Sequence, residues 1–160
     1  MHRYKQIVYR AGITIEVVKC IPGSERKGYG GVRSKRTKKT KAEMQEANLR
    51  QAARKLARKI NANFKPGDWH LTLTYKKEMR PDTGQAKRII SDFLSKLRRE
   101  YRKCGFELKY IQTTEYLNKS IHHHLIINNI NDGLRTTESI TRKLWKDYGR
   151  RQFVPLYENG

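Results

Sequence analysis

Cysteine and long apolar runs are both scarce in this chain. Its 160 residues include two cysteines, Cys20 and Cys104, and neither has a second cysteine nearby. This spacing excludes a disulfide framework and a cysteine-based zinc site, and it favours two free thiols in a reducing compartment. No apolar run approaches the length of a membrane span, and the N-terminus lacks a signal-peptide pattern. We therefore expect a soluble, cytoplasmic protein with no membrane partner.

Acidic residues are also few, because 36 Lys and Arg stand against 15 Asp and Glu and leave a net charge of +21. Such an excess is larger than solubility requires, and it indicates a polyanionic partner, with nucleic acid first. The alternative is a basic structural protein of a ribosome or nucleoid. Hydrophobic residues make up 36% of the chain, which is enough for one domain with a real core.

Residues 1–62 read as a basic N-terminal extension. Two β-branched segments around Gly12 predict a short hairpin. The stretch 21–41 is rich in glycine, lysine and arginine, so we expect a loop that stays mobile until it meets its partner. Apolar residues then recur at helical spacing from Thr40, an expected N-cap that forms a capping box with Glu43. Candidate phosphate contacts in the loop are Arg33, Lys35, Arg36, Lys38 and Lys39.

Residues 63–160 read as a second unit with the order β-α-β-β-α-β. "WHLTLTYK" alternates apolar and polar residues as a strand does, and two helical patterns and three further strand patterns follow it. This order predicts an α+β, ferredoxin-like or RRM-like antiparallel sheet with its helices on one face. The expected strands are 69–76, 107–116, 121–128 and 151–157, and the expected helices are 84–103 and one from Thr136 or Thr137 through Tyr148.

Three consecutive histidines interrupt the strand pattern of "YIQTTEYLNKSIHHHLIIN". Side chains alternate between the faces of a strand, so His122 and His124 share one face and His123 takes the other. A four-residue loop over 117–120 places Glu115 opposite His122 and Thr113 opposite His124. A loop longer or shorter by one residue would invert this assignment.

Two imidazoles and a carboxylate on one face form a set of ligands that suits a divalent cation. We expect Glu115, His122 and His124 to bind Mn²⁺ or Mg²⁺, with Zn²⁺ also able to enter. The alternative is an ordinary polar strand face. His123 points away from this set, and we interpret it as a neutral core or interface histidine.

"TEYLNKSIHHHLIIN" resembles the second motif of HUH endonucleases, the rolling-circle replication initiators, and "WHLTLTYK" resembles their first motif. The family fold is the same βαββαβ sheet. The closest resemblance is to replication-associated proteins of phages and small plasmids. One position departs from the pattern, because His123 stands where the family has Tyr or an aliphatic residue.

The resemblance implies a metal-dependent nickase in a bacterial cell. A tyrosine attacks single-stranded or hairpin DNA at a replication origin and forms a 5′-phosphotyrosine link, with host replication proteins as further partners. The family's tyrosine lies on a helix after the last strand, whereas this chain stops at Gly160. Tyr157 and Tyr148 are the candidates within the chain. We otherwise expect the nucleophile beyond Gly160, in a longer initiator, or a relative that binds without cutting.

Two other classes stay open. A single-tyrosine transposase shares the His-x-His strand, but the long basic N-terminal segment favours an initiator. A non-catalytic RRM-like module would bind RNA or single-stranded DNA by stacking bases on central aromatic residues. The expected open face offers histidine and threonine instead, including Thr72 and Thr74, which are either DNA contacts or plain strand residues. His70 shares their face, and it reaches the metal only if its strand lies beside the histidine strand.

Overall fold

The computed structural model describes residues 4–20, 40–116 and 120–157. The chain divides into two compact units, residues 1–63 and residues 64–160, and each is described by itself. The predicted basic loop 21–41 falls almost wholly outside the described residues, and so do positions 117–119 of the predicted hairpin loop. Among the described residues, no helix is both long and apolar enough to cross a membrane.

The first unit is a two-stranded hairpin and a long helix. Strands β1 (Lys5–Ala11) and β2 (Thr14–Cys20) pair antiparallel, and helix α1 covers Lys41–Asn63. The turn between the strands contains Gly12, whose φ of +57° suits glycine. The predicted capping box is confirmed, because the Glu43 amide donates to Thr40 Oγ1 over 3.2 Å and the Thr40 amide donates to Glu43 Oε2 over 2.8 Å.

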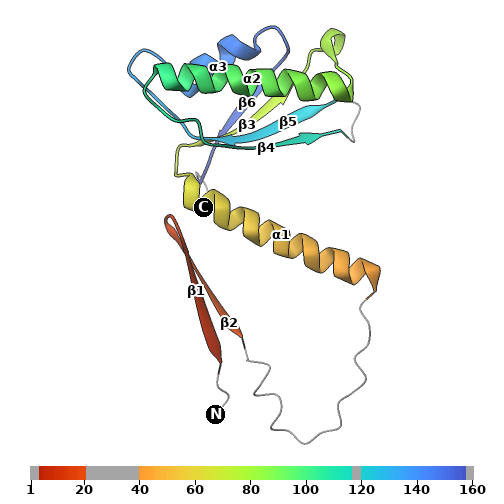
Figure 1. Ribbon diagram of the computed structural model, residues 1–160, viewed down its shortest axis with the longest axis vertical. Helices are drawn as coiled ribbons and strands as arrows, with labels where there is room; N and C mark the ends of the chain where they lie inside the picture. Colours follow the sequence, from red (N-terminus) through yellow and green to blue (C-terminus); the bar gives the residue numbers. More distant parts are fainter. Residues whose placement is uncertain (1–3, 21–39, 117–119, 158–160) are drawn as a thin grey trace, which may run out of the picture. The chain divides into compact units, whose positions relative to one another are not determined.

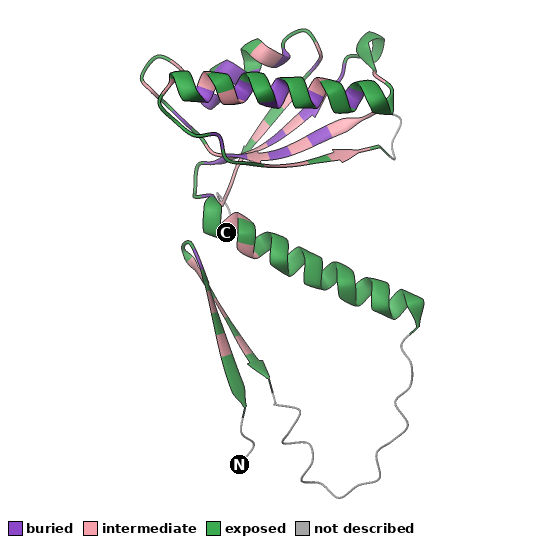
Figure 2. Cartoon of the chain, in the orientation of Figure 1, coloured by how far each residue is buried: buried purple, intermediate pink, exposed green. Residues whose placement is uncertain are grey.

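Polar contacts, more than apolar burial, join the hairpin to α1. Arg58 donates from Nε to Glu16 Oε2 over 2.7 Å, and its guanidinium lies 3.5 Å from the centroid of the Tyr9 ring. Asn61 donates to Thr14 Oγ1 over 3.1 Å. Helix α1 itself has no buried residue, and Figure 2 shows it exposed along most of its length.

The second unit is a four-stranded antiparallel sheet with two helices on one face (Figure 1). Neighbouring strands follow the order β4-β5-β3-β6. In this order β5 separates two strands joined by the crossover through α2, as the ferredoxin-like arrangement requires, so the predicted fold class is confirmed. The strands are β3 (Trp69–Thr74), β4 (Tyr110–Glu115), β5 (His122–Ile127) and β6 (Arg151–Pro155), and the helices are α2 (Thr83–Lys103), α3 (Thr137–Trp145) and a short 3-10 turn, η2 (Lys77–Met79).

The core lies between the sheet and its two helices. Strands β3 and β5 supply alternate buried residues, and Figure 2 shows the buried side of α2 facing them. The largest fully buried side chain is Trp145 of α3, which donates from Nε1 to the carbonyl of Thr74 over 3.1 Å. Burial of this apolar face, and not helix propensity, holds α2 and α3 in place.

Several predicted boundaries were wrong by a few residues. Helix α3 ends at Trp145 and not at Tyr148, because the chain tightens there: the amides of Tyr148 and Gly149 both donate to the Trp145 carbonyl. Strand β4 begins at Tyr110, three residues later than expected. Helix α2 starts from Asp82, which forms with Gln85 a capping box that the sequence analysis did not anticipate.

Candidate functional site

The hairpin of β4 and β5 has the register that the loop length predicted. Glu115 pairs with His122, and Thr113 pairs with His124. Strand β3 lies on the other side of β5, where Thr72 pairs with His124 and Thr74 with His122. The residues therefore meet on the sheet face that carries no helix of residues 64–160 (Figure 1).

This open face is organised in rows that cross the strands. One row contains Glu115, His122 and Thr74, and it lies at the end of the sheet where β5 begins. The remaining two rows run from β4 to β6 and contain, respectively, Thr113, His124, Thr72 and Gln152, and Ile111, Ile126, His70 and Val154. The face is thus polar at one end and mostly apolar at the other.

His124 is the centre of the polar end. Its Nε2 lies 3.7 Å from Glu115 Oε2, and its Nδ1 lies 3.3 Å from Thr72 Oγ1. The ring of His70 stacks on the His124 ring with centroids 5.7 Å apart. Burial, and then the neighbouring His124, lower the pKa of His70. The sequence raised His70 only as a conditional neighbour, and the pairing of β3 with β5 is what brings it close.

His122 shares the face but not the contact. Its Nε2 lies 3.4 Å from Ser120 Oγ, at the hairpin end of the strand. In the described ranges, no group of three or more His, Cys, Asp or Glu side chains is close enough together to hold a metal ion. The side chains of Glu115, His122 and His124 have the chemistry that Mn²⁺ or Mg²⁺ accepts, and two of the three already face each other.

His123 faces the core, as predicted. It is fully buried, with Nε2 2.7 Å from Tyr75 Oη and Nδ1 2.8 Å from Thr114 Oγ1. Burial, and then the charges of its neighbours His122 and His124, lower the pKa of His123 to about 4, so its ring is neutral at pH 7. Burial also raises the pKa of Tyr75. The two polar partners explain why an imidazole is accepted here.

The two candidate tyrosines lie away from His124. The Tyr148 ring packs against Trp145 and Tyr75, with centroids at 4.9 Å and 6.4 Å, on the helix-covered side of the sheet. Tyr157 follows β6, where the Leu156 amide donates to the Asp68 carbonyl. Asp68 precedes β3, and at about 3.3 Å per residue it lies about 13 Å from Thr72, the neighbour of His124.

The predicted DNA contacts divide between described and undescribed residues. Thr72 and Thr74 lie half-exposed on the open face. The five basic candidates, Arg33, Lys35, Arg36, Lys38 and Lys39, lie outside the described residues.

The open face and its histidines fall within the part of the chain that has a known counterpart. Residues 68–159 match the model of a family of replication-associated proteins, the one named after ORF2. No curated protein and no solved structure matches the chain.

Proposed function

The chain belongs to the ORF2 family of replication-associated proteins, and from this premise we propose that it is the DNA-nicking domain of a rolling-circle replication initiator of the HUH type. The family describes a replication protein. The finer proposal adds the reaction: cleavage of single-stranded DNA at an origin by a tyrosine hydroxyl, with a divalent cation.

The observation that carries the proposal is the arrangement of Glu115 and His124 on the open face. Their side-chain atoms lie 3.7 Å apart, and His122 projects from the next position on the same face of β5. Carboxylate and imidazole are the donors that a catalytic divalent cation takes at a phosphodiester. A strongly basic chain has no other evident use for a second and third imidazole beside a carboxylate.

Glu115, His122 and His124 would hold the ion. When bound, a divalent cation neutralises and orients a phosphodiester. His122 would leave Ser120 to join the other two. Thr72 supports His124: if Nδ1–H donates to Thr72 Oγ1, the lone pair of Nε2 is left facing the side of Glu115.

The open face also suits a single strand more than stacked recognition of RNA. Among its described residues, the three rows contain histidine, threonine, glutamine, glutamate, isoleucine and valine, with no Phe, Tyr or Trp. An RRM-like module stacks bases on aromatic residues at the sheet centre. This composition favours the nickase over a non-catalytic RNA-binding module.

Incubation with a labelled single-stranded hairpin oligonucleotide, with Mn²⁺ or with EDTA, tests the proposal. We expect a Mn²⁺-dependent covalent adduct on a denaturing protein gel, and Tyr148→Phe and Tyr157→Phe show whether either tyrosine forms it. If neither substitution removes the adduct, peptide mapping identifies the attacking residue.

A chain without its nucleophile gives a different pattern. It forms no adduct but binds the oligonucleotide more tightly with Mn²⁺, and the gain disappears in Glu115→Ala and His124→Ala. The absence of both an adduct and any effect of Mn²⁺ would contradict the proposal and leave a basic nucleic-acid-binding sheet.

A further inference from the structure

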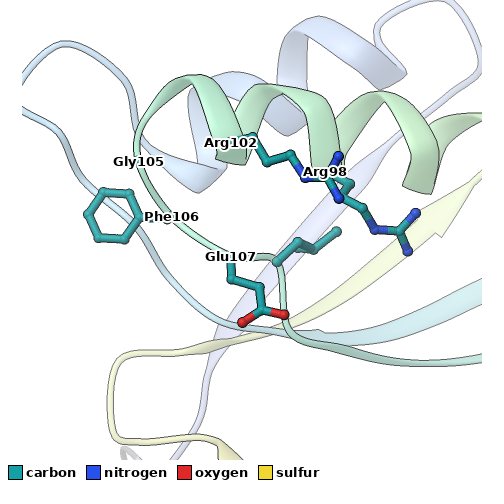
Figure 3. A pocket seen from close by; sticks show the side chains of 6 residues that line it. Arg98, Arg102, Gly105, Phe106 and Glu107 are labelled. Carbon is teal, nitrogen blue, oxygen red and sulfur yellow. The ribbon is translucent and has the colours of Figure 1, made fainter.

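A groove lies beside the C-terminal half of α2, away from the open-face histidines. It has a volume of about 490 Å³ and is lined by Arg98, Arg102, Gly105, Phe106, Glu107 and Leu108 (Figure 3). A second hollow of about 450 Å³ continues it along α2 and shares Arg98 and Arg102. The second hollow adds Asp92, Ser95, Lys96 and Arg99. The two arginines therefore border one continuous surface.

This surface is cationic. Four basic side chains line the two hollows, against the carboxylates of Asp92 and Glu107. In Figure 3 the Glu107 carboxylate points away from α2, whereas Arg98 and Arg102 project from the helix itself. Lys103, outside the groove, pairs with Glu100 over 2.7 Å. Within the described ranges, neither Arg98 nor Arg102 forms an ion pair with a protein carboxylate, so both guanidinium groups are available to an anion.

Two aromatic rings are exposed beside these arginines. Phe106 is 41% exposed and Tyr110, at the start of edge strand β4, is 38% exposed. Arg98 Nη2 lies 3.4 Å from Tyr110 Oη, and its guanidinium lies 5.8 Å from the ring centroid. An exposed phenyl ring beside arginines without a carboxylate partner matches the pattern of single-strand binding surfaces, in which bases stack on aromatic residues and phosphates contact arginine.

Helix termination explains part of this arrangement but not all of it. Arg102 and Lys103 in the last turn complement the negative end of the helix dipole, and Gly105, with a φ of +79°, ends the helix. Arg98 lies one turn earlier, where the dipole effect has faded, and Phe106 gains nothing from exposure to water.

We propose that this groove binds single-stranded DNA as a second contact of the protein, with Arg98 and Arg102 on phosphates and Phe106 against a base. The inference rests on the proposed function only in that both share single-stranded DNA as the partner. Tyr110 and Glu115 lie at opposite ends of β4, about 17 Å apart at 3.3 to 3.4 Å per residue. A strand that reaches both surfaces therefore needs about five phosphates at 3.4 Å each.

Fluorescence anisotropy in EDTA tests the groove without the open-face metal. The probe is a labelled single strand of about 20 nucleotides, longer than the 4 to 16 that one small domain covers. The same sequence as a duplex is measured beside it. The test variant is Arg98→Gln/Arg102→Gln, and the matched control is Lys143→Gln/Lys146→Gln, which removes the same charge from exposed positions at and just after the end of α3.

We expect the arginine variant to bind the single strand at least about tenfold more weakly and to lower the slope of log affinity against log salt by about 1.4, since each phosphate contributes about 0.7. The control should change the affinity by less than about threefold, because exposed charges far from the bound strand are screened. Phe106→Ala should weaken single-strand binding about tenfold with no change of slope, because it removes stacking and not charge. Thermal melts check that each variant is folded.

Equal losses in the arginine variant and the control would overturn the groove, since net charge alone would then explain binding. Loss of duplex binding as large as the loss of single-strand binding would overturn the assignment to a single strand. The nicking assay separates the two proposals. An adduct with unchanged binding by the groove variants overturns the groove alone, and groove-dependent binding without any metal effect overturns the nickase alone. No binding of single-stranded DNA by the unmodified protein overturns both.

Discussion

His123 Nε2 and Tyr75 Oη lie 2.7 Å apart in the core, on the opposite side of β5 from the open-face histidines. Thr114 Oγ1 contacts the other ring nitrogen over 2.8 Å. The buried imidazole is thus held at both nitrogens, between the two residues that the proposed function places at the metal. Fixing His123 also fixes which face His122 and His124 occupy.

Loss of this contact should cost stability in a coupled way. Tyr75→Phe leaves His123 Nε2 without its partner, and His123→Leu leaves the Tyr75 hydroxyl without one, each at a cost of about 1–3 kcal/mol. In the double variant no polar atom of this pair is left unsatisfied, so the two costs should not add. Urea unfolding of the three variants gives the coupling energy, and simple additivity would contradict the direct contact.

The stability of the protein should fall as the pH falls from about 6.5 to about 4. The unfolded chain binds a proton at His123 near its ordinary pKa of about 6.5, whereas the folded protein resists it until the lowered pKa of about 4. The unfolded state therefore binds more protons in this window, and the difference amounts to about 3 kcal/mol. The contribution is complete above pH 6.5 and is lost toward pH 4.

His123→Gln is the control for this pH dependence, because glutamine keeps a donor and an acceptor but does not titrate. The difference in the free energy of unfolding between the unmodified protein and the variant should shrink or reverse as the pH falls. A difference that stays constant from pH 7 to pH 4 would show that His123 does not titrate in this range.

Gly149 should resist substitution more than any turn glycine of the sheet unit. A Cβ at this position would lie 1.9 Å from the carbonyl oxygen of Thr74 and 2.8 Å from Tyr75 Cα, both on the backbone of the segment that carries the candidate site. Gly149→Ala should therefore destabilise by about 3 kcal/mol or more, since β3 and the chain before β6 must separate.

Gly133→Ala is the matched comparison, because its Cβ meets nothing within 4 Å and only its φ of +86° opposes the change. We expect it to cost about 1 kcal/mol. Thermal or urea unfolding compares the two, and equal costs would contradict the close approach at Gly149.

Thr72 should tune the affinity for a divalent cation without being a ligand. Thr72→Val keeps the shape of the strand residue but removes the hydroxyl 3.3 Å from His124 Nδ1. Loss of such a supporting hydrogen bond typically weakens metal binding about 10- to 100-fold. Mn²⁺ titration measures the change. Thr113→Val, on the other neighbour of His124, is the control and should leave the affinity within about threefold.

Local rules predicted the histidine hairpin well. Strand alternation and the loop length together predicted that Glu115 would face His122, since both are short-range properties of the chain. The order of elements predicted the sheet class in the same way. Thr40 with Glu43 was recognisable from capping chemistry alone.

The remaining features depend on contacts between distant segments. The stack of His70 on His124 requires β3 to pair with β5, which lies 52 residues further along the chain at the Thr72–His124 contact. The partner of His123 is Tyr75, 48 residues away, and no local pattern identifies it. The early end of α3 has a similar cause, because Trp145 is committed to the carbonyl of Thr74. The groove at Arg98 and Phe106 is also invisible to periodicity, since it joins a helix face to the loop that follows it.

Mn²⁺ binding measured by electron paramagnetic resonance tests the account most directly. We expect the protein to bind one Mn²⁺ per chain, and Glu115→Ala and His124→Ala to lose at least about tenfold in affinity, which corresponds to about 1.4 kcal/mol. His123→Gln, on the same strand but facing the core, should bind Mn²⁺ as the unmodified protein does. Absence of Mn²⁺ binding, or binding that survives both open-face substitutions, would contradict the metal site and the nickase built on it.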